Sequence, residues 1–168
     1  ATVSGNTVTI VGAGTTDITA SQAGNASYNA AANVKQTLTV DKIDQTITFA
    51  VLEAKKYGDA SFSLTATSTS GLAVTYTSSN TSVATVSGNT VTIVGAGTTN
   101  ITASQAGNAN YKSAADVEQA LTVDKADQTI TFAVLEAKKY GDVSFSLTAT
   151  ATSGLAVTYT SSNTSVAT

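Results

Sequence analysis

The sequence predicts an all-β protein made of tandem Greek-key β-sandwiches. Residues 1–85 and 84–168 are nearly the same sequence, with ten differences among the 85 aligned positions. In this alignment Ala84 is the equivalent of Ala1. Short segments alternate apolar and polar residues with a period of two, and turn signals rich in Gly, Asn and Ser separate them. The repeat is too long for a solenoid unit and has a suitable length for a small sandwich domain.

One full copy of the repeat extends over residues 43–125 and contains about seven expected strands. Each segment has apolar side chains at alternate positions, which is the pattern of a strand with one buried face. The expected strands are Gln45–Phe49, Ser61–Thr67, Ala73–Thr77, Val83–Ser87, Thr90–Val94, Thr98–Ser104 and Val117–Val123. No segment has a helical period of useful length, so we expect no helices.

The repeat divides the chain into half a domain, a whole domain and the complementary half. Residues 1–42 match the C-terminal half of the repeat, from part of the fourth strand to the seventh. Residues 43–125 form a complete copy, and residues 126–168 match the N-terminal half, up to the start of the fourth strand. Two explanations stay open. Either the sequence is a window onto a long tandem array, or separate chains join head to tail and complete each other's half-domains.

Composition argues against catalysis and against nucleic-acid binding. The chain has no His, Cys, Arg, Met, Trp or Pro. It therefore lacks the commonest general base, the thiol nucleophile and the usual zinc and haem ligands. A net charge of −3 is the opposite of the basic surface that nucleic acids need. We expect no enzyme activity, no cofactor, no nucleic-acid partner and, without an apolar run of about 20 residues, no membrane span in this segment.

Two stretches resemble known bacterial domains. Tyr76–Ala103 (YTSSNTSVATVSGNTVTIVGAGTTNITA) resembles the C-terminal portion of the bacterial immunoglobulin-like domains of group 2. Gln128–Asn163, with its Tyr-Gly-Asp, resembles a repeat that is often arrayed in giant secreted adhesins. The resemblance covers the whole chain. It implies an immunoglobulin-like sandwich in an extracellular, surface-anchored or filament-forming bacterial protein, in which neighbouring copies of the repeat form a stalk, and it transfers no catalytic residues.

The segment Val8–Gly14 (VTIVGAG) looks like a strand that enters a dinucleotide-binding glycine loop. The third glycine of that motif is missing, because Asp17 stands there in one copy and Asn100 in the other. The following residues have a strand pattern, so no helix N-terminus is expected to hold a pyrophosphate. We expect a hairpin between the fifth and sixth strands instead, with glycines that adopt positive φ.

The junctions between copies are the other candidate sites. The segment Val40–Gln45 has no Gly, Ser or Pro run, which predicts a short and stiff connection. Calcium ions at such junctions can stiffen a stalk, but calcium takes six to eight oxygen ligands. We therefore expect solvated linker charge and keep only weak calcium candidates, which are Asp41, Asp44, Asp124 and Asp127.

For three other groups of residues we favour a structural explanation over a functional one. Lys55 and Lys56 are expected to be an exposed pair, because an intramolecular lysine cross-link needs a desolvated site. Tyr28 and Tyr111 are expected to cover the end of the core, with their hydroxyls on the backbone. Exposed aromatic rings would instead support the alternative function, a carbohydrate- or host-surface-binding adhesin module. The charge swap between Lys35 and Glu118 suggests a solvent-facing edge without strong pairing.

Overall fold

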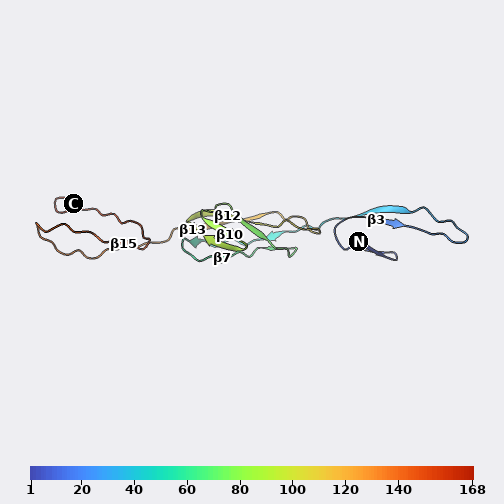
Figure 1. The fold of residues 1–168 in the computed structure, drawn as a ribbon, viewed down its shortest axis with the longest axis horizontal. Helices are drawn as coiled ribbons and strands as arrows, with labels where there is room; N and C mark the ends of the chain where they lie inside the picture. Colours follow the sequence, from blue (N-terminus) through green and yellow to red (C-terminus); the bar gives the residue numbers. More distant parts are fainter. The chain divides into compact units, whose positions relative to one another are not determined.

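The computed structural model describes every residue from Ala1 to Thr168 and confirms the all-β class. The chain contains fifteen strands in several small sheets and no helix (Figure 1). None of its segments is therefore a helix with the length and apolar character needed to cross a membrane. The chain falls into two compact units, Ala1–Lys125 and Ala126–Thr168, which are described separately.

The middle copy, residues 43–125, holds most of the strands. β10, β11 and β7 form a three-stranded sheet in that order, and β6, β13, β12 and β9 form a four-stranded sheet. Neighbouring strands are antiparallel except β13 and β6, which are parallel, and a small pair joins β5 to β8. The strands are β5 (Ile47–Thr48), β6 (Lys55–Lys56), β7 (Phe62–Ser63), β8 (Thr67–Ser68), β9 (Thr75–Ser78), β10 (Ala84–Ser87), β11 (Thr90–Ile93), β12 (Gly97–Ser104) and β13 (Val117–Asp124).

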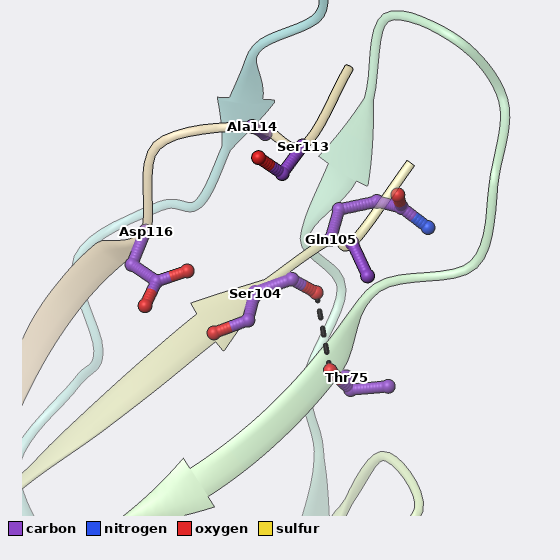
Figure 2. A pocket seen from close by; sticks show the side chains of 7 residues that line it. Thr75, Ser104, Gln105, Ser113, Ala114 and Asp116 are labelled. Carbon is purple, nitrogen blue, oxygen red and sulfur yellow. Dashed lines mark hydrogen bonds between the residues drawn. The ribbon is translucent and has the colours of Figure 1, made fainter. Parts of the chain in front are cut away.

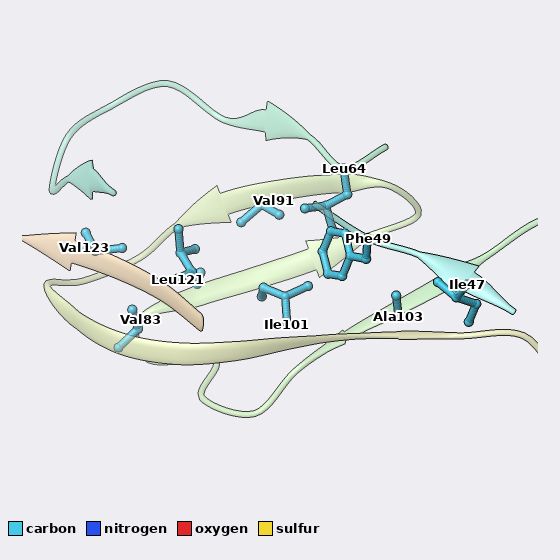
Figure 3. Packing of buried hydrophobic residues seen from close by; sticks show 10 residues of the cluster. Ile47, Phe49, Leu64, Val83, Val91, Ile101, Ala103, Leu121 and Val123 are labelled. Carbon is cyan, nitrogen blue, oxygen red and sulfur yellow. The ribbon is translucent and has the colours of Figure 1, made fainter. Parts of the chain in front are cut away.

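One hydrophobic core joins the two sheets of the middle copy (Figure 3). Val91 on β11, Ile101 on β12 and Leu121 on β13 are fully buried. Because side chains from both sheets meet in one cluster, the arrangement is consistent with the β-sandwich class. Every buried apolar residue of the chain lies in this copy: Ile47, Phe49, Leu64, Val83, Ala84, Val91, Ile101, Ala103, Leu121 and Val123.

The first half of the repeat differs from the expected seven strands. The segment Ser61–Thr67 is not one strand, because β7 pairs with β11 in the three-stranded sheet whereas β8 pairs with β5. Between them, the N–H of Ala66 donates to the hydroxyl of Tyr76 at 2.8 Å. The backbone changes pairing partner between β7 and β8. The alternation of apolar and polar residues therefore runs through the segment although no single ladder of backbone hydrogen bonds does. The middle copy therefore has nine short strands, and β6 and β8 were not expected.

The glycine segment that resembles a nucleotide loop connects the two sheets, so the predicted hairpin is wrong. β11 belongs to the three-stranded sheet and β12 to the four-stranded sheet, and the two strands do not pair. A Cβ on Gly95 would lie 2.7 Å from the carbonyl oxygen of Ser82, so the close approach requires glycine. Gly97 has φ 143°, which confirms the expected positive φ, and strand β12 begins at this residue.

Both partial copies keep the local pairings of the middle copy. Residues 1–42 form β1 (Thr2–Ser4), β2 (Thr7–Thr9), β3 (Gly14–Ala20) and β4 (Val34–Val40). Gly14 pairs with Val40, as Gly97 pairs with Val123 in the middle copy. Residues 126–168 form only β14 (Ile130–Thr131) and β15 (Thr150–Ala151), with the register of β5 and β8. No residue of either partial copy is buried.

Candidate functional site

The junction between the first and second copies is bound to the loop of residues 105–114, which precedes β13. The N–H of Ile43 donates to the carbonyl oxygen of Asn110 at 2.9 Å, and the N–H of Lys112 donates to the carbonyl oxygen of Ile43 at 2.9 Å. These bonds form a parallel bridge between Ile43 and Tyr111. The loop therefore holds the linker backbone as a neighbouring strand would.

Gln45 attaches the end of the linker to the middle copy by side-chain hydrogen bonds. Its side chain is buried, with 6% exposure, and its amide nitrogen donates to the carbonyl oxygen of Lys112 at 2.6 Å and to Gln105 Oε1 at 3.0 Å. Its amide oxygen accepts a hydrogen bond from the Ser70 hydroxyl at 2.5 Å. Buried amides need such partners, and here they connect the linker to two separate loops.

Charged and polar side chains add to this attachment. Lys112 Nζ lies 2.9 Å from Asp44 Oδ1, and the hydrogen bond and charge of Asp44 raise the pKa of Lys112. Lys42 Nζ donates to the carbonyl oxygen of Asn108 at 2.8 Å. Asn110 Oδ1 accepts a hydrogen bond from the N–H of Ala13 in the preceding copy at 2.9 Å. The linker and its flanks thus have specific partners in one loop.

The four weak calcium candidates at the junctions stay a prediction. Asp44 is paired with Lys112, and the backbone carbonyl of Asp124 accepts a hydrogen bond from the N–H of Tyr57. The structure contains no group of three or more acidic, His or Cys side chains that could hold a metal ion. What it does show at the junction of Asp41 and Asp44 is direct binding by the loop of residues 105–114.

The lysine and tyrosine expectations need correction. Lys56 is exposed as expected, whereas Lys55 is half-buried, and its ammonium lies 5.0 Å from the centre of the Phe62 ring. Tyr111 lies at the junction, while Tyr28 is 76% exposed. The tyrosine whose hydroxyl binds the backbone is Tyr76, which reaches Ala66 from β9. The sequence did not single out Tyr76, because its position on a strand gave no sign of this contact.

The edge with charge swaps faces the solvent, as expected, but its exposed side chains have partners across the strands, which were not expected. In the first copy, Lys35 Nζ lies 3.1 Å from Asp17. The pKa of Asp17 is lowered chiefly by the hydrogen bond from the Thr37 hydroxyl and, to a smaller extent, by that from Lys35. In the middle copy, Glu118 replaces Lys35 and accepts a hydrogen bond from Asn100 at 3.3 Å. The two substitutions together keep an attractive contact between the strands.

Two hollows on the surface lie beside equivalent loops, one in the middle copy and one in the first copy. One, of about 480 Å³, is open and lined by small or polar side chains, among which Thr75 donates to the carbonyl oxygen of Ser104 at 3.2 Å (Figure 2). Its charged lining residue is Asp116. The other, of about 280 Å³, is lined by Gln22, Gly24, Asn25, Tyr28, Asn29 and Ala31. In the middle copy, the equivalents of Gln22 and Asn29, which are Gln105 and Lys112, bind the linker residue Gln45.

Several apolar residues that the partial copies expose have equivalents that the middle copy buries. Phe132 is 47% exposed, whereas its equivalent Phe49 is 7% exposed. Val8 is 40% exposed, whereas its equivalent Val91 is fully buried. Burial of each such side chain stabilises a fold by about 1.5–3 kcal/mol. The partial copies therefore present the two halves of a core.

Comparison with family models, with curated proteins and with solved structures found no significant match to this chain. The side chains of Gln45, Gln105 and Asn110 hold the junction in place, and the sequence patterns did not identify them. Amide side chains occur throughout this chain, and the partner of Gln45 is far away in sequence, so no local pattern distinguishes these residues.

Proposed function

We propose that this chain is a segment of a structural stalk or filament, built from tandem immunoglobulin-like β-sandwich repeats of a secreted bacterial surface protein. Its role is to provide length and mechanical continuity, either in one long chain or by head-to-tail completion of half-domains. The observation that carries the proposal is the junction at Ile43–Gln45. Hydrogen bonds attach it to the loop of residues 105–114 of the same copy. Ala13 and Lys42 of the preceding copy donate hydrogen bonds to Asn110 and Asn108 of that loop, so the two copies share a defined connection.

The strand architecture of the repeat supports this role. The chain enters the middle copy beside the loop that precedes β13 and leaves it at the far end of β13, after Asp124. The length of β13 separates these points by about 25 Å. A pulling force is therefore applied along a strand that pairs with β12 over most of its length and with β6 at its end.

A carbohydrate-binding module, the alternative, has less support. Phe132 and Tyr159 are exposed aromatic rings that a sugar could stack on. Their centroids lie 5.7 Å apart, and the equivalent rings of Phe49 and Tyr76 lie at the same distance within the middle copy. The arrangement is thus the one that packs a repeat. A glycan array probed with the full chain separates the two functions, and specific sugar binding would favour the alternative.

Small-angle X-ray scattering of a chain with several tandem copies tests the stalk role. We expect the maximum dimension to grow in proportion to the number of copies, since each junction is bound to the next repeat. The matched control replaces residues 41–44 with a Gly-Ser sequence of the same length, which should give a more compact average. Identical profiles for the two chains, both typical of independently moving domains, would contradict the proposal.

A further inference from the structure

We propose that the loop of residues 105–114 sets the stiffness of the junction that precedes its repeat, through its side chains at positions 110 and 112. This inference rests on the proposed stalk function and deepens it, because it names the residues that regulate how firmly two successive repeats are held. Asn110 and Lys112 of the middle copy make a stiff junction. Ser and Asn at the same two positions, as in the loop of the first copy, make a looser one.

Two hydrogen bonds cross directly from the first copy to this loop. The N–H of Ala13 donates to Asn110 Oδ1 at 2.9 Å, and Lys42 Nζ donates to the carbonyl oxygen of Asn108 at 2.8 Å. Lys42 belongs to the linker, whereas Ala13 comes just before β3 and is distant from the linker in sequence. A covalent connection alone leaves two domains free to move relative to each other, so the bond between Ala13 and Asn110 adds a second attachment point.

The segment that Asn110 contacts is the glycine segment just before β3. A Cβ on Gly12 would lie 3.0 Å from Asn110 Oδ1, so the absence of a side chain there leaves room for the amide. Ala96, the equivalent of Ala13, is exposed in the middle copy, so a complete repeat also has this residue at its surface. In the first copy, the segment that resembles a nucleotide loop therefore binds an amide oxygen of the following repeat.

Lys112 attaches the linker to the same loop. Its ammonium lies 2.9 Å from Asp44 Oδ1, next to the backbone bridge between Ile43 and Tyr111. Both partners of the ion pair are exposed, and exposed ion pairs contribute modestly and are screened by salt. Asn110 therefore has the larger share in the stiffness of the junction, and Lys112 has the smaller one.

The backbone that presents these two side chains has the same hydrogen bonds in both copies. Asn108 Oδ1 accepts hydrogen bonds from the N–H groups of Asn110 and Tyr111, at 2.8 and 3.0 Å. Asn25 Oδ1 accepts the corresponding bonds in the first copy, at 2.8 and 3.1 Å. Since one turn serves both loops, the residues at positions 110 and 112 can differ without a change in the fold of the loop.

The differences between the copies fall on these contacts. Ser27 stands at the position of Asn110, and its hydroxyl ends one bond closer to the backbone than an asparagine oxygen, so it falls short of this hydrogen bond. Asn29 stands at the position of Lys112 and has no ammonium for an aspartate. The partners are the same in both copies, because Ala13, Lys42 and Asp44 correspond to Ala96, Lys125 and Asp127. These side-chain contacts therefore vary on the loop side alone.

One hydrogen bond is enough to change the behaviour of the junction. A typical hydrogen bond in a protein shifts an equilibrium by about fivefold. Loss of the bond between Ala13 and Asn110 should therefore lower the ratio of docked to undocked junctions by about fivefold, where a docked junction is one in which the first copy contacts the loop. Loss of the Lys112–Asp44 pair lowers this ratio further, so a double variant is the most sensitive test.

The test measures the spread of distances between the two copies in the full chain, by electron paramagnetic resonance of paired spin labels. The chain has no cysteine, so Thr39→Cys on β4 and Thr85→Cys on β10 provide unique labelling sites, and both positions are exposed. The labelled chain should give a narrow distance distribution. Addition of Asn110→Ser and Lys112→Asn should broaden the distribution, and equal widths would overturn the inference.

Two single variants of the labelled chain are matched controls. Asn110→Asp keeps an oxygen acceptor at the same reach, and Ser113→Ala makes another of the differences between the two loops, at a residue that lines the hollow of about 480 Å³. Both variants should keep the narrow distribution. If Ser113→Ala broadened it as much as the double variant does, any change in the loop would loosen the junction, and the assignment to positions 110 and 112 would be wrong.

Amide hydrogen exchange, followed by NMR, reports the contact at Ala13 directly. The N–H of Ala13 should exchange about fivefold faster in Asn110→Ser than in the unmodified chain, because it loses its acceptor. Asn110→Asp should leave the exchange rate unchanged. The same rate in Asn110→Ser and in the unmodified chain would contradict the inference.

Replacement of residues 41–44 by the Gly-Ser sequence separates this inference from the stalk function. If that linker broadens the distance distribution and the chain with Asn110→Ser and Lys112→Asn does not, the inference fails and the stalk function stands. A broad distribution in the unmodified chain itself would contradict both.

Discussion

The ammonium of Lys112 lies 2.9 Å from a carboxylate oxygen of Asp44, and this ion pair ties a loop of the middle repeat to the linker that precedes it. The first copy has Asn29 in place of Lys112, so the pair distinguishes one junction from the other. It lies beside the backbone bridge of Ile43 and Tyr111. The junction is therefore a structured element of the repeat and more than a spacer.

The Lys112–Asp44 pair predicts a dependence of stability on alkaline pH. The pairing raises the pKa of Lys112 above its usual 10.5, so its contribution is present below 10.5 and is lost as the pH rises through the folded-state pKa. Thermal melting of the chain and of Asp44→Asn should differ from neutral pH up to pH 10.5 and converge only as the pH rises through the raised folded-state pKa of Lys112. A difference that persists undiminished in strong alkali would show that the ion pair is not its cause.

Gln45→Ala should destabilise the middle copy by about 1–3 kcal/mol, because it leaves buried polar partners without hydrogen bonds. Urea unfolding followed by tyrosine fluorescence measures this change. Gln128→Ala is the matched control at the same repeat position, and it should leave the unfolding of the middle copy unchanged. Equal losses in the two variants would mean that the buried amide is not responsible.

Leu121→Ala should cost about 2–5 kcal/mol, because it opens a cavity at a fully buried position. Leu38→Ala makes the same chemical change at the same position of the first copy, where the side chain is half-exposed. In dilute protein, we expect the unfolding transition of the middle copy to keep its midpoint in Leu38→Ala. A comparable loss at both positions would place Leu38 in an equally packed core.

Tyr76→Phe should lower the free energy of unfolding by about 1 kcal/mol, since the N–H of Ala66 loses its acceptor. The aromatic contact with Phe49 remains in this variant, so the effect reports the hydroxyl alone. Tyr57→Phe, at a residue 53% exposed, serves as the control and should have no measurable effect. Chemical denaturation of both variants gives the comparison.

The sequence predicted the second half of the repeat better than the first. β12 and β13 nearly coincide with the expected Thr98–Ser104 and Val117–Val123, because long alternating segments pair with each other nearby in sequence. β6 was missed because it is very short and depends on a parallel partner, β13, that lies at the other end of the repeat. Short strands of this kind depend on distant partners that local patterning does not reveal.

The candidate site was predicted only in outline. The lack of Gly, Ser and Pro in Val40–Gln45 directed attention to the junction, but the residues that hold it come from a loop near the far end of the same repeat. The sequence also suggested complementary halves, because the repeat positions match. It could not show that β3 and β4, or Phe132 and Tyr159, keep their packed geometry within the partial copies.

Single-molecule extension of a chain of tandem copies of residues 43–125 tests the central claim most directly. If each repeat is one mechanical unit, the force trace should show a regular series of unfolding events. Each event should release about 25 nm, which is the extended length of one repeat less its folded length. A smooth extension without events, or irregular steps unrelated to the repeat length, would contradict a structural role based on independent and continuous repeats.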